Sequence, residues 1–309
     1  MRFITFDFDG QTRPGILRMD DVFDLSPSFD SLLAIIDGGA AALASARRLA
    51  DEADPIAKLD KIRLQAPIPQ PRRSVFATGW NYHDHFEEGR DKRDDERDEI
   101  PDYPTFFTKA STTVIGPTDP VPHDAALSDR IDYEAEIAVV IGRGGRSIPA
   151  EAALDHVFGY TLANDVTARD IQRRHGNQWD KGKSIDASCP LGPVIVTADE
   201  IGDPQALELR CWVNGEIRQQ ASTAAMAFPI ASIIEHLSSG MTLVPGDILL
   251  TGTPAGVGYV MEPPRFLEPG DTVEVSSPQI GELRNPVEAR SLTTYEPWDA
   301  TRGGAGSVR

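Results

Sequence analysis

Apolar and polar residues alternate through much of the chain with the two-residue period of β-strands. Residues 132–141 read Asp-Tyr-Glu-Ala-Glu-Ile-Ala-Val-Val-Ile, and a second apolar run, 157–163, is followed directly by Asn-Asp. Successive side chains of a strand point to opposite faces, so Asp132, Glu134 and Glu136 would share one face. We therefore predict one strand over 132–141 and a second strand that ends at a carboxylate.

Turn signals separate further β-rich segments between Ser74 and about Glu288, where long helical patterns are few. The Asp-Gly pair at residues 9–10 lies between two apolar runs and predicts a β-hairpin, with a connection longer than the ideal two residues. Four stretches carry a helical pattern: 28–37, 40–51, 167–174 and 228–238. We therefore predict an α+β fold that is rich in β-structure.

The same pass along the chain predicts two domains. Residues 1–65 would form a small N-terminal αβ domain, and the proline-rich residues 66–73 a linker. Residues 74–290 would form the main domain, which carries every chemical motif described below. The glycine-rich residues 291–309 would form a C-terminal tail.

The 309-residue chain has 48 acidic and 30 basic residues, a formal net charge of −18. This charge argues against nucleic acids and anionic membranes as partners, but a metal ion could still attract an anionic substrate. Two cysteines, Cys189 and Cys211, are too few for a disulfide framework or a cysteine-rich zinc site. No window approaches about 18 consecutive apolar residues. We therefore expect a cytoplasmic protein without a membrane segment.

Glu134, Glu136 and Asp165 are candidate metal ligands. Carboxylates side by side on one strand face repel each other unless a cation or shared protons compensate. Three carboxylate oxygens suit a hard cation such as Mg²⁺, which keeps coordination positions for water and substrate. An isolated Glu-x-Glu pair is more often a solvated strand edge, but the third carboxylate favours a metal site.

His85 and Glu88 are candidates for a base and its orienting carboxylate. They follow an apolar strand and stand three residues apart, so a helix would bring them to one face. A carboxylate beside an imidazole fixes its tautomer and raises its basicity, as activation of water requires. His83 and Glu87 satisfy the same geometry, and either pair could also be an adventitious pair on an exposed helix.

Three further polar residues could contact a substrate. Arg169 and Gln172 would share a helical face next to Asp165 and could hold a carboxylate or keto oxygen. Lys183 could neutralise a developing enolate, although each of these residues is also common on a surface. The segment around Lys183 imitates a phosphate-binding loop, but five residues separate Gly176 from Gly182 where four are needed. We therefore reject nucleotide binding.

The run 249–258, Leu-Leu-Thr-Gly-Thr-Pro-Ala-Gly-Val-Gly, reads as a strand entering a glycine-rich turn. Such a turn could present backbone N–H groups to an anion. A tight turn that needs glycine at positive φ explains the same residues equally well.

Five motifs occur in a fixed order: NYxxHxxE, YExE, NDVTARDxQ, KGKSIDxSCPLGP and TGTPAGVG. Over roughly residues 72–290 this order resembles the fumarylacetoacetate hydrolase family. The resemblance implies a mixed β-sandwich roll, a homodimer and one Mg²⁺ or Mn²⁺ held by three carboxylates. Residues 89–102, a charged stretch longer than the typical family loop, are a departure that could form a lid.

The resemblance also implies roles for individual residues. The metal ligands would be Glu134, Glu136 and Asp165. The base would be His85 with Glu88, while His83 would not be catalytic. The residues in contact with substrate would be Lys183, Arg169, Gln172 and Thr253.

These roles predict a divalent-metal-dependent hydrolase that cleaves a carbon–carbon bond in a small anionic 2,4-diketo acid, such as an acylpyruvate or a fumarylacetoacetate-like compound. His85 would activate water, and the metal with Lys183 would stabilise the enolate. Enzymatic alternatives on the same scaffold are a decarboxylase of 2-oxo acids and a hydroxymuconate-type isomerase. A catalytically silent metal-binding dimer is the alternative from another class.

Overall fold

The structure is a computed structural model that describes residues 1–92 and 99–296. Part of the charged stretch 89–102, which could be a lid or a passive surface insertion, and most of the C-terminal tail therefore lie outside the described residues. Within the described ranges, no helix is long and apolar enough to cross a bilayer.

A large sheet runs through the molecule, and twelve strands belong to it among the described residues. Its main path is, in order, β4 (Ala57–Lys58), β3 (Asp21–Asp24), β2 (Gln11–Arg18), β1 (Arg2–Phe8), β15 (Cys189–Thr197), β13 (Val157–Asn164), β11 (Ala135–Ile141), β19 (Ile248–Leu250), β6 (Val75–Gly79) and β7 (Thr105–Lys109). Off this path, β5 (Arg63–Gln65) pairs with β1 and β8 (Val114–Ile115) with β15.

A second sheet packs against the central strands β11, β13 and β15. Its order is β17 (Glu216–Ser222), β16 (Glu208–Val213), β20 (Thr272–Ser277), β21 (Gly281–Ala289) and β9 (Val121–His123). Two short pairs complete the described strands: β10 (Ile131–Asp132) with β14 (Thr167–Ala168), and β12 (Gly145–Arg146) with β18 (Thr242–Leu243). Antiparallel pairs dominate, but β19 pairs parallel with β6. The predicted α+β, β-rich sandwich is confirmed.

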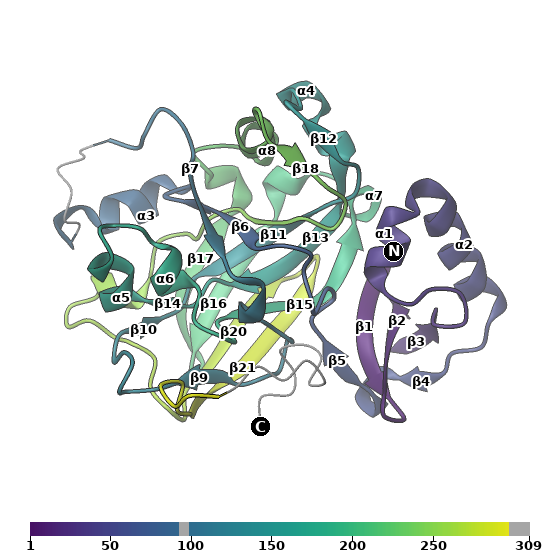
Figure 1. Cartoon of the computed structure of the whole chain (residues 1–309), viewed down its shortest axis with the longest axis horizontal. Coiled ribbons are helices and arrows are strands. Elements are labelled where there is room, and N and C mark those ends of the chain that lie inside the picture. Colours follow the sequence, from purple (N-terminus) through teal and green to yellow (C-terminus); the bar gives the residue numbers. More distant parts are fainter. Residues whose placement is uncertain (93–98, 297–309) are drawn as a thin grey trace.

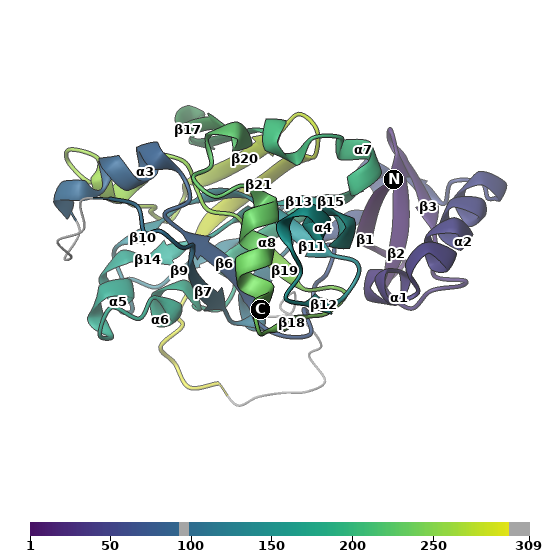
Figure 2. The same ribbon diagram turned by 90° about the horizontal axis from the view of Figure 1, so that it is seen from above.

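The helices are short and lie around the sheets. They are α1 (Leu32–Asp37), α2 (Gly39–Glu52), α3 (His83–Glu88), α4 (Ala150–Ala153), α5 (Arg169–Arg174), α6 (Asp180–Lys183), α7 (Ala198–Ile201) and α8 (Ile230–Ser238). Figures 1 and 2 show α1 and α2 at one end of the molecule and α3 and α5 at the other. The helix predicted over 28–37 begins only at Leu32, because the Ser31 side chain accepts a hydrogen bond from the Ala34 N–H and caps it there.

Strand β11 is buried on both faces. Ile137 and Val139 belong to the core between the two sheets, whereas Ala138 and Val140 belong to a second core on the opposite face, which also contains apolar residues of α1 and α2. Because both faces are covered, this strand is nearly continuous in apolar residues, and its one carboxylate, Glu136, is buried with them.

Two predictions about strands are wrong in detail. The strand expected over 132–141 is interrupted, since β10 ends at Asp132 and β11 begins at Ala135. Between them the Glu134 N–H donates to Asn164 Oδ1, so the backbone leaves the ladder and Asp132 no longer shares a face with its neighbours. The hairpin connection is two residues rather than longer: Asp9 and Gly10 both have positive φ, 49° and 75°, which lets β2 begin at once.

The large sheet runs across the predicted boundary between the N-terminal and main domains. Strand β1 pairs with β2 on one side and with β15 on the other. Ala66, Pro67 and Ile68 of the predicted linker are buried. Figure 1 shows the N-terminal strands continuing the central ones. The division at residues 66–73 stays a prediction, and any two domains share this sheet.

Candidate active site

The three predicted metal ligands lie together. Pairing of β11 with β13 sets Ala135 opposite Asn164, and the Asp165 N–H donates to the Glu134 carbonyl oxygen at 2.8 Å. This register brings one oxygen each of Glu134, Glu136 and Asp165 within 4.8 Å of one another, and all three side chains are buried.

Cationic side chains surround two of these carboxylates. Lys183 Nζ lies 2.7 Å from both Glu134 Oε2 and Asp165 Oδ2. Lys109 Nζ lies 2.9 Å from Asp165 Oδ1, and Arg169 Nη2 lies 2.7 Å from Glu134 Oε1. Burial alone would raise the pKa of Glu134, but Lys183 and Arg169 outweigh it and lower that pKa to about 2.

Glu136 has the opposite electrostatic environment. Burial first, and then repulsion from Asp165 and Glu134, raise its pKa well above the ordinary value. The Gly252 N–H donates to Glu136 Oε2 at 2.6 Å. Among the described residues, the Glu136 carboxylate therefore accepts a hydrogen bond from a backbone N–H but forms no ion pair with a side chain.

The three carboxylates fit a hard divalent cation. All the donors are carboxylate oxygens, which Mg²⁺ and Mn²⁺ prefer over softer ligands. Asp165 Oδ1 is buried and accepts no hydrogen bond from the described residues, because the Lys109 contact is an ion pair without hydrogen-bond geometry. A buried oxygen of this kind is a suitable ligand atom.

The predicted dyad is formed on α3. His85 Nδ1 lies 2.7 Å from Glu88 Oε1, and the Gly256 N–H donates to Glu88 Oε2 at 2.7 Å. The carboxylate can therefore accept the Nδ1 proton and leave Nε2 free to act as a base. In the competing pair, His83 is exposed and Glu87 instead binds Arg90.

Arg169 and Thr253 already have partners within the protein. Arg169 Nε donates to Asp132 Oδ2 at 2.8 Å, and its guanidinium lies 4.4 Å from the centre of the Tyr259 ring. The Thr253 hydroxyl donates to the Ala135 carbonyl oxygen and accepts from Gln219 Nε2. Both residues line the cavity described below, so any contact with substrate uses their remaining atoms.

The glycine-rich turn binds anions, but they are the protein's own. The N–H groups of Gly252, Gly256 and Gly258 donate to Glu136, Glu88 and Asp132 respectively, at 2.6–2.8 Å. Glycine is also needed for the backbone, since Gly252 and Gly256 have φ of 93° and 112°. The need for glycine at positive φ is thus confirmed, and the N–H groups of the turn donate to the protein's own carboxylates rather than to a ligand.

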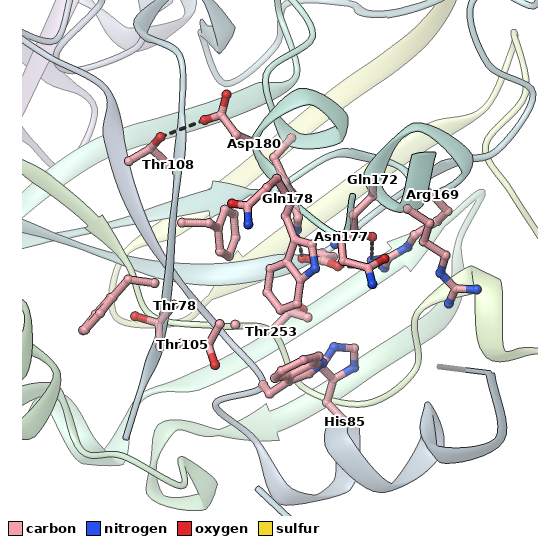
Figure 3. A pocket seen from close by; sticks show the side chains of 18 of the residues that line it. Thr78, His85, Thr105, Thr108, Arg169, Gln172, Asn177, Gln178, Asp180 and Thr253 are labelled. Atoms are coloured by element: carbon pink, nitrogen blue, oxygen red, sulfur yellow. Dashed lines mark hydrogen bonds and ion pairs between the residues drawn. The ribbon is translucent and has the colours of Figure 1, made fainter. Parts of the chain in front are cut away.

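These groups share one cavity of about 500 Å³, which His85, Glu134, Glu136, Lys183, Arg169, Gln172 and Thr253 all line. Figure 3 shows His85 approaching it from below and Gln178 and Asp180 from above. One wall is aromatic: the Trp179 ring meets those of Trp80 and Phe107 nearly edge-on, at centroid distances of 4.7 and 5.4 Å.

Sequence reasoning missed several residues of the site. Lys109 is fully buried and touches Asp165, and Asp132 anchors Arg169. The wall residues Trp80 and Trp179 were missed as well. One signal was readable for Lys109: it ends the apolar run Thr-Phe-Phe-Thr-Lys, where a charged side chain needs a partner.

Known proteins are similar to this chain over most of its length. The chain is 43% identical over 274 residues to oxaloacetate tautomerase YisK of Bacillus subtilis, covering 86% of this chain and 89% of the relative. It is 39% identical to the mitochondrial oxaloacetate tautomerase fahd2 of Xenopus laevis, covering 93% of this chain and 90% of the relative.

Two solved structures are similar over 94% of this chain and all of theirs. A fumarylacetoacetate hydrolase from Exiguobacterium antarcticum has a TM-score of 0.80 and 41% identity. A maleylpyruvate hydrolase from Sphingobium, in complex with manganese and pyruvate, has a TM-score of 0.77 and 30% identity. The profile of the fumarylacetoacetate hydrolase C-terminal domain matches residues 74–288. The chain therefore belongs to the fumarylacetoacetate hydrolase family.

Proposed function

We propose that the protein is a divalent-metal-dependent tautomerase that interconverts the keto and enol forms of a small 2-oxo dicarboxylic acid of the oxaloacetate type. One observation carries the proposal: His85, which Glu88 orients, lines the same cavity as Glu134, Glu136 and Lys183. Tautomerisation needs a proton carrier and positive charge beside the 2-oxo oxygen, which Lys183 and a divalent cation held by the carboxylates would supply. The relatives named as oxaloacetate tautomerases match most of this chain and support the choice.

The chemistry follows from the positions of the side chains. A divalent cation held by Glu134, Glu136 and Asp165 would supply Lewis-acid polarisation of the 2-oxo group. His85 Nε2 takes a proton from C3, and the C–H electron pair forms the C2–C3 double bond while the carbonyl electrons move to oxygen. Lys183 stabilises the negative charge on that oxygen. Return of the proton to the oxygen completes the enol, so no other reactant is consumed.

Polar groups on the cavity wall would bind the substrate carboxylates. Gln172, Asn177 and Gln178 line the cavity near Arg169, and Figure 3 shows their side chains grouped there. Amide and guanidinium N–H groups are the donors that carboxylates accept. We propose that Arg169, Gln172 and Thr253 shape this part of the cavity and contact the substrate with atoms not already hydrogen-bonded.

Hydrolysis of a carbon–carbon bond in an acylpyruvate is the second candidate. The same dyad could take a proton from water instead of carbon, and the similar maleylpyruvate hydrolase is named for such a reaction. This hydrolase was our prediction from the sequence. Identity alone does not rank the two candidates, because the relatives named as tautomerases are 39–43% identical and the two structures named as hydrolases are 41% and 30% identical. We prefer the tautomerase because its chemistry needs only the proton carrier and the positive charge at the 2-oxo group, and because both curated relatives described above are named for that activity.

The test measures three quantities separately: loss of enol absorbance, release of CO₂ and release of pyruvate. The protein is incubated with Mg²⁺ or Mn²⁺ and enol-oxaloacetate, and then with a panel of acylpyruvates. We expect enol absorbance to decay faster than in buffer, without CO₂ and without cleavage of any acylpyruvate. His85→Ala should abolish the acceleration, and His83→Ala, at an exposed position of the same helix, is the matched control. Stoichiometric pyruvate from an acylpyruvate would favour the hydrolase instead.

A homodimer is also proposed, on the family resemblance alone. Light scattering of the purified protein measures it directly: a mass near twice the 33.6 kDa of the chain supports the dimer, and a mass near 33.6 kDa contradicts it.

A further inference from the structure

The chain's own cations bind the oxygens that a metal would need. Lys183 contacts Glu134 Oε2 and Asp165 Oδ2, each at 2.7 Å. Lys109 lies 2.9 Å from the second oxygen of Asp165, and Arg169 lies 2.7 Å from the second oxygen of Glu134. Both oxygens of two of the three ligands therefore already contact a positive charge.

The two lysines are held firmly in place. Lys109 is fully buried, and its ammonium group also donates to the carbonyl oxygens of Val166 and Lys183 and to Ser188 Oγ. Lys183 is almost as buried, with 2% of its surface exposed, and its ammonium lies 4.9 Å from the centre of the Phe107 ring. Neither lysine can move away from the carboxylates without losing several contacts.

A count of formal charges gives the consequence. With all four carboxylates ionised, as binding of a metal requires, Asp132, Glu134, Glu136 and Asp165 contribute −4, and Lys109, Arg169 and Lys183 contribute +3, so the cluster carries −1. A divalent cation brings the cluster to +1, and a dianionic substrate returns it to −1. Charges in a buried site interact strongly because little water screens them.

We propose that Lys109 and Lys183 weaken the binding of a divalent cation to the carboxylate triad, so that tight binding requires an anionic substrate in the same cavity. The inference rests on the metal-dependent function proposed above. By linkage, the cation must then strengthen substrate binding by the same factor. The lysines would thus make metal and substrate bind together rather than independently.

The test measures Mn²⁺ affinity by calorimetry and by electron paramagnetic resonance, with and without oxalate as the anionic probe. In the wild-type protein, oxalate should tighten Mn²⁺ binding about 5- to 150-fold, the usual range of coupling between sites. Lys183→Met should tighten Mn²⁺ binding without oxalate by a factor in about the same range, and the effect of oxalate should shrink.

Three variants separate charge from structure. Lys183→Arg keeps the charge and should keep the wild-type affinity. Lys181→Met, on an exposed position of the same helix, should change nothing. Lys109→Met should tighten Mn²⁺ binding as Lys183→Met does. If Lys109→Met does not fold, the comparison of Lys183→Met with Lys183→Arg tests the inference alone.

The outcomes separate this inference from the proposed function. Unchanged or weaker Mn²⁺ binding in Lys183→Met, with wild-type protein that binds Mn²⁺, overturns the role of the lysines and leaves the metal-dependent function standing. Wild-type protein that binds no Mn²⁺ with or without oxalate overturns both. Tighter binding in Lys183→Met but not in Lys183→Arg supports the inference.

Discussion

Replacing Glu88 with glutamine isolates the contribution of the dyad. The Glu88 carboxylate has two partners, His85 Nδ1 and the Gly256 N–H, each at 2.7 Å. Glutamine has one acceptor oxygen and one NH₂ group, so it can accept from only one of them. If the oxygen stays on Gly256, the NH₂ group donates to His85 Nδ1 and places the imidazole proton on Nε2, where it blocks the base.

The magnitude follows from this change of tautomer. Loss of a positioned general base costs about 10²–10⁴ in rate, and we expect kcat to fall within that range while KM changes little. The free energy of unfolding should fall by only about 1 kcal/mol, because a charge-assisted hydrogen bond is replaced by a neutral one and the side chain is partly exposed. Activity and stability should therefore separate.

The assay combines initial rates of enol loss with thermal unfolding of the same samples. Glu87→Gln is the matched control, because Glu87 lies on the same helix but binds Arg90 at the surface. A kcat for Glu88→Gln within threefold of the control would refute the reasoning that this carboxylate fixes the tautomer of His85. A fall in kcat matched by an equal fall for Glu87→Gln would point to damage to the helix.

Three further predictions follow from contacts in the site. Asp165→Asn should weaken Mn²⁺ binding, measured by calorimetry, by more than ~10–100-fold, the loss typical when a residue that only hydrogen-bonds to a metal ligand is mutated. An unchanged affinity would exclude Asp165 as a ligand. Gly182→Ala should lower the free energy of unfolding by ~1–3 kcal/mol, measured by denaturant unfolding, because the added Cβ would lie 2.4 Å from the backbone nitrogen of Gln172. Thr253→Val should lower the free energy of unfolding by ~1–3 kcal/mol, because it removes the donor to the Ala135 carbonyl oxygen. KM for the keto acid should stay nearly unchanged, and a tenfold rise in KM would instead show that the hydroxyl binds substrate.

The sequence predicted the three clustered carboxylates, our candidate metal ligands, because each carries a local signal. Glu134 and Glu136 stand two apart before an apolar run, and Asp165 follows another such run, so strand periodicity alone marks them. The pairing of the two strands, which sets Ala135 opposite Asn164, then brings them together. Periodicity did not extend to Asp132, because the strand breaks between Asp132 and Ala135. Glu134 lies in the same break, and its place beside Asp165 depends on its backbone hydrogen bonds with Asn164 and Asp165 rather than on a continuous ladder.

The partners of these ligands could not be predicted, because they depend on which strands become neighbours. Lys109 ends β7 at one edge of the large sheet, yet it reaches Asp165 at the end of β13. Nothing within the local sequence of either strand encodes that contact. The pairing of β1 with β15 has the same character, and it makes the N-terminal segment part of the main sheet.

One short turn connects the separate parts of the site. Its Gly252 N–H binds Glu136, a candidate metal ligand, and its Gly256 N–H binds Glu88, the partner of the candidate base His85. Its Gly258 N–H binds Asp132, which accepts from Arg169. Side chains would not fit there, since a Cβ at Gly256 or Gly258 would lie about 2 Å from a carbonyl oxygen of a neighbouring segment. A backbone that binds the buried carboxylates of Asp132 and Glu136 and the partly exposed one of Glu88 costs no side-chain entropy and fixes their relative positions. The glycine-rich motif, ambiguous on its own in the sequence, is thus the element that relates the base to the metal ligands.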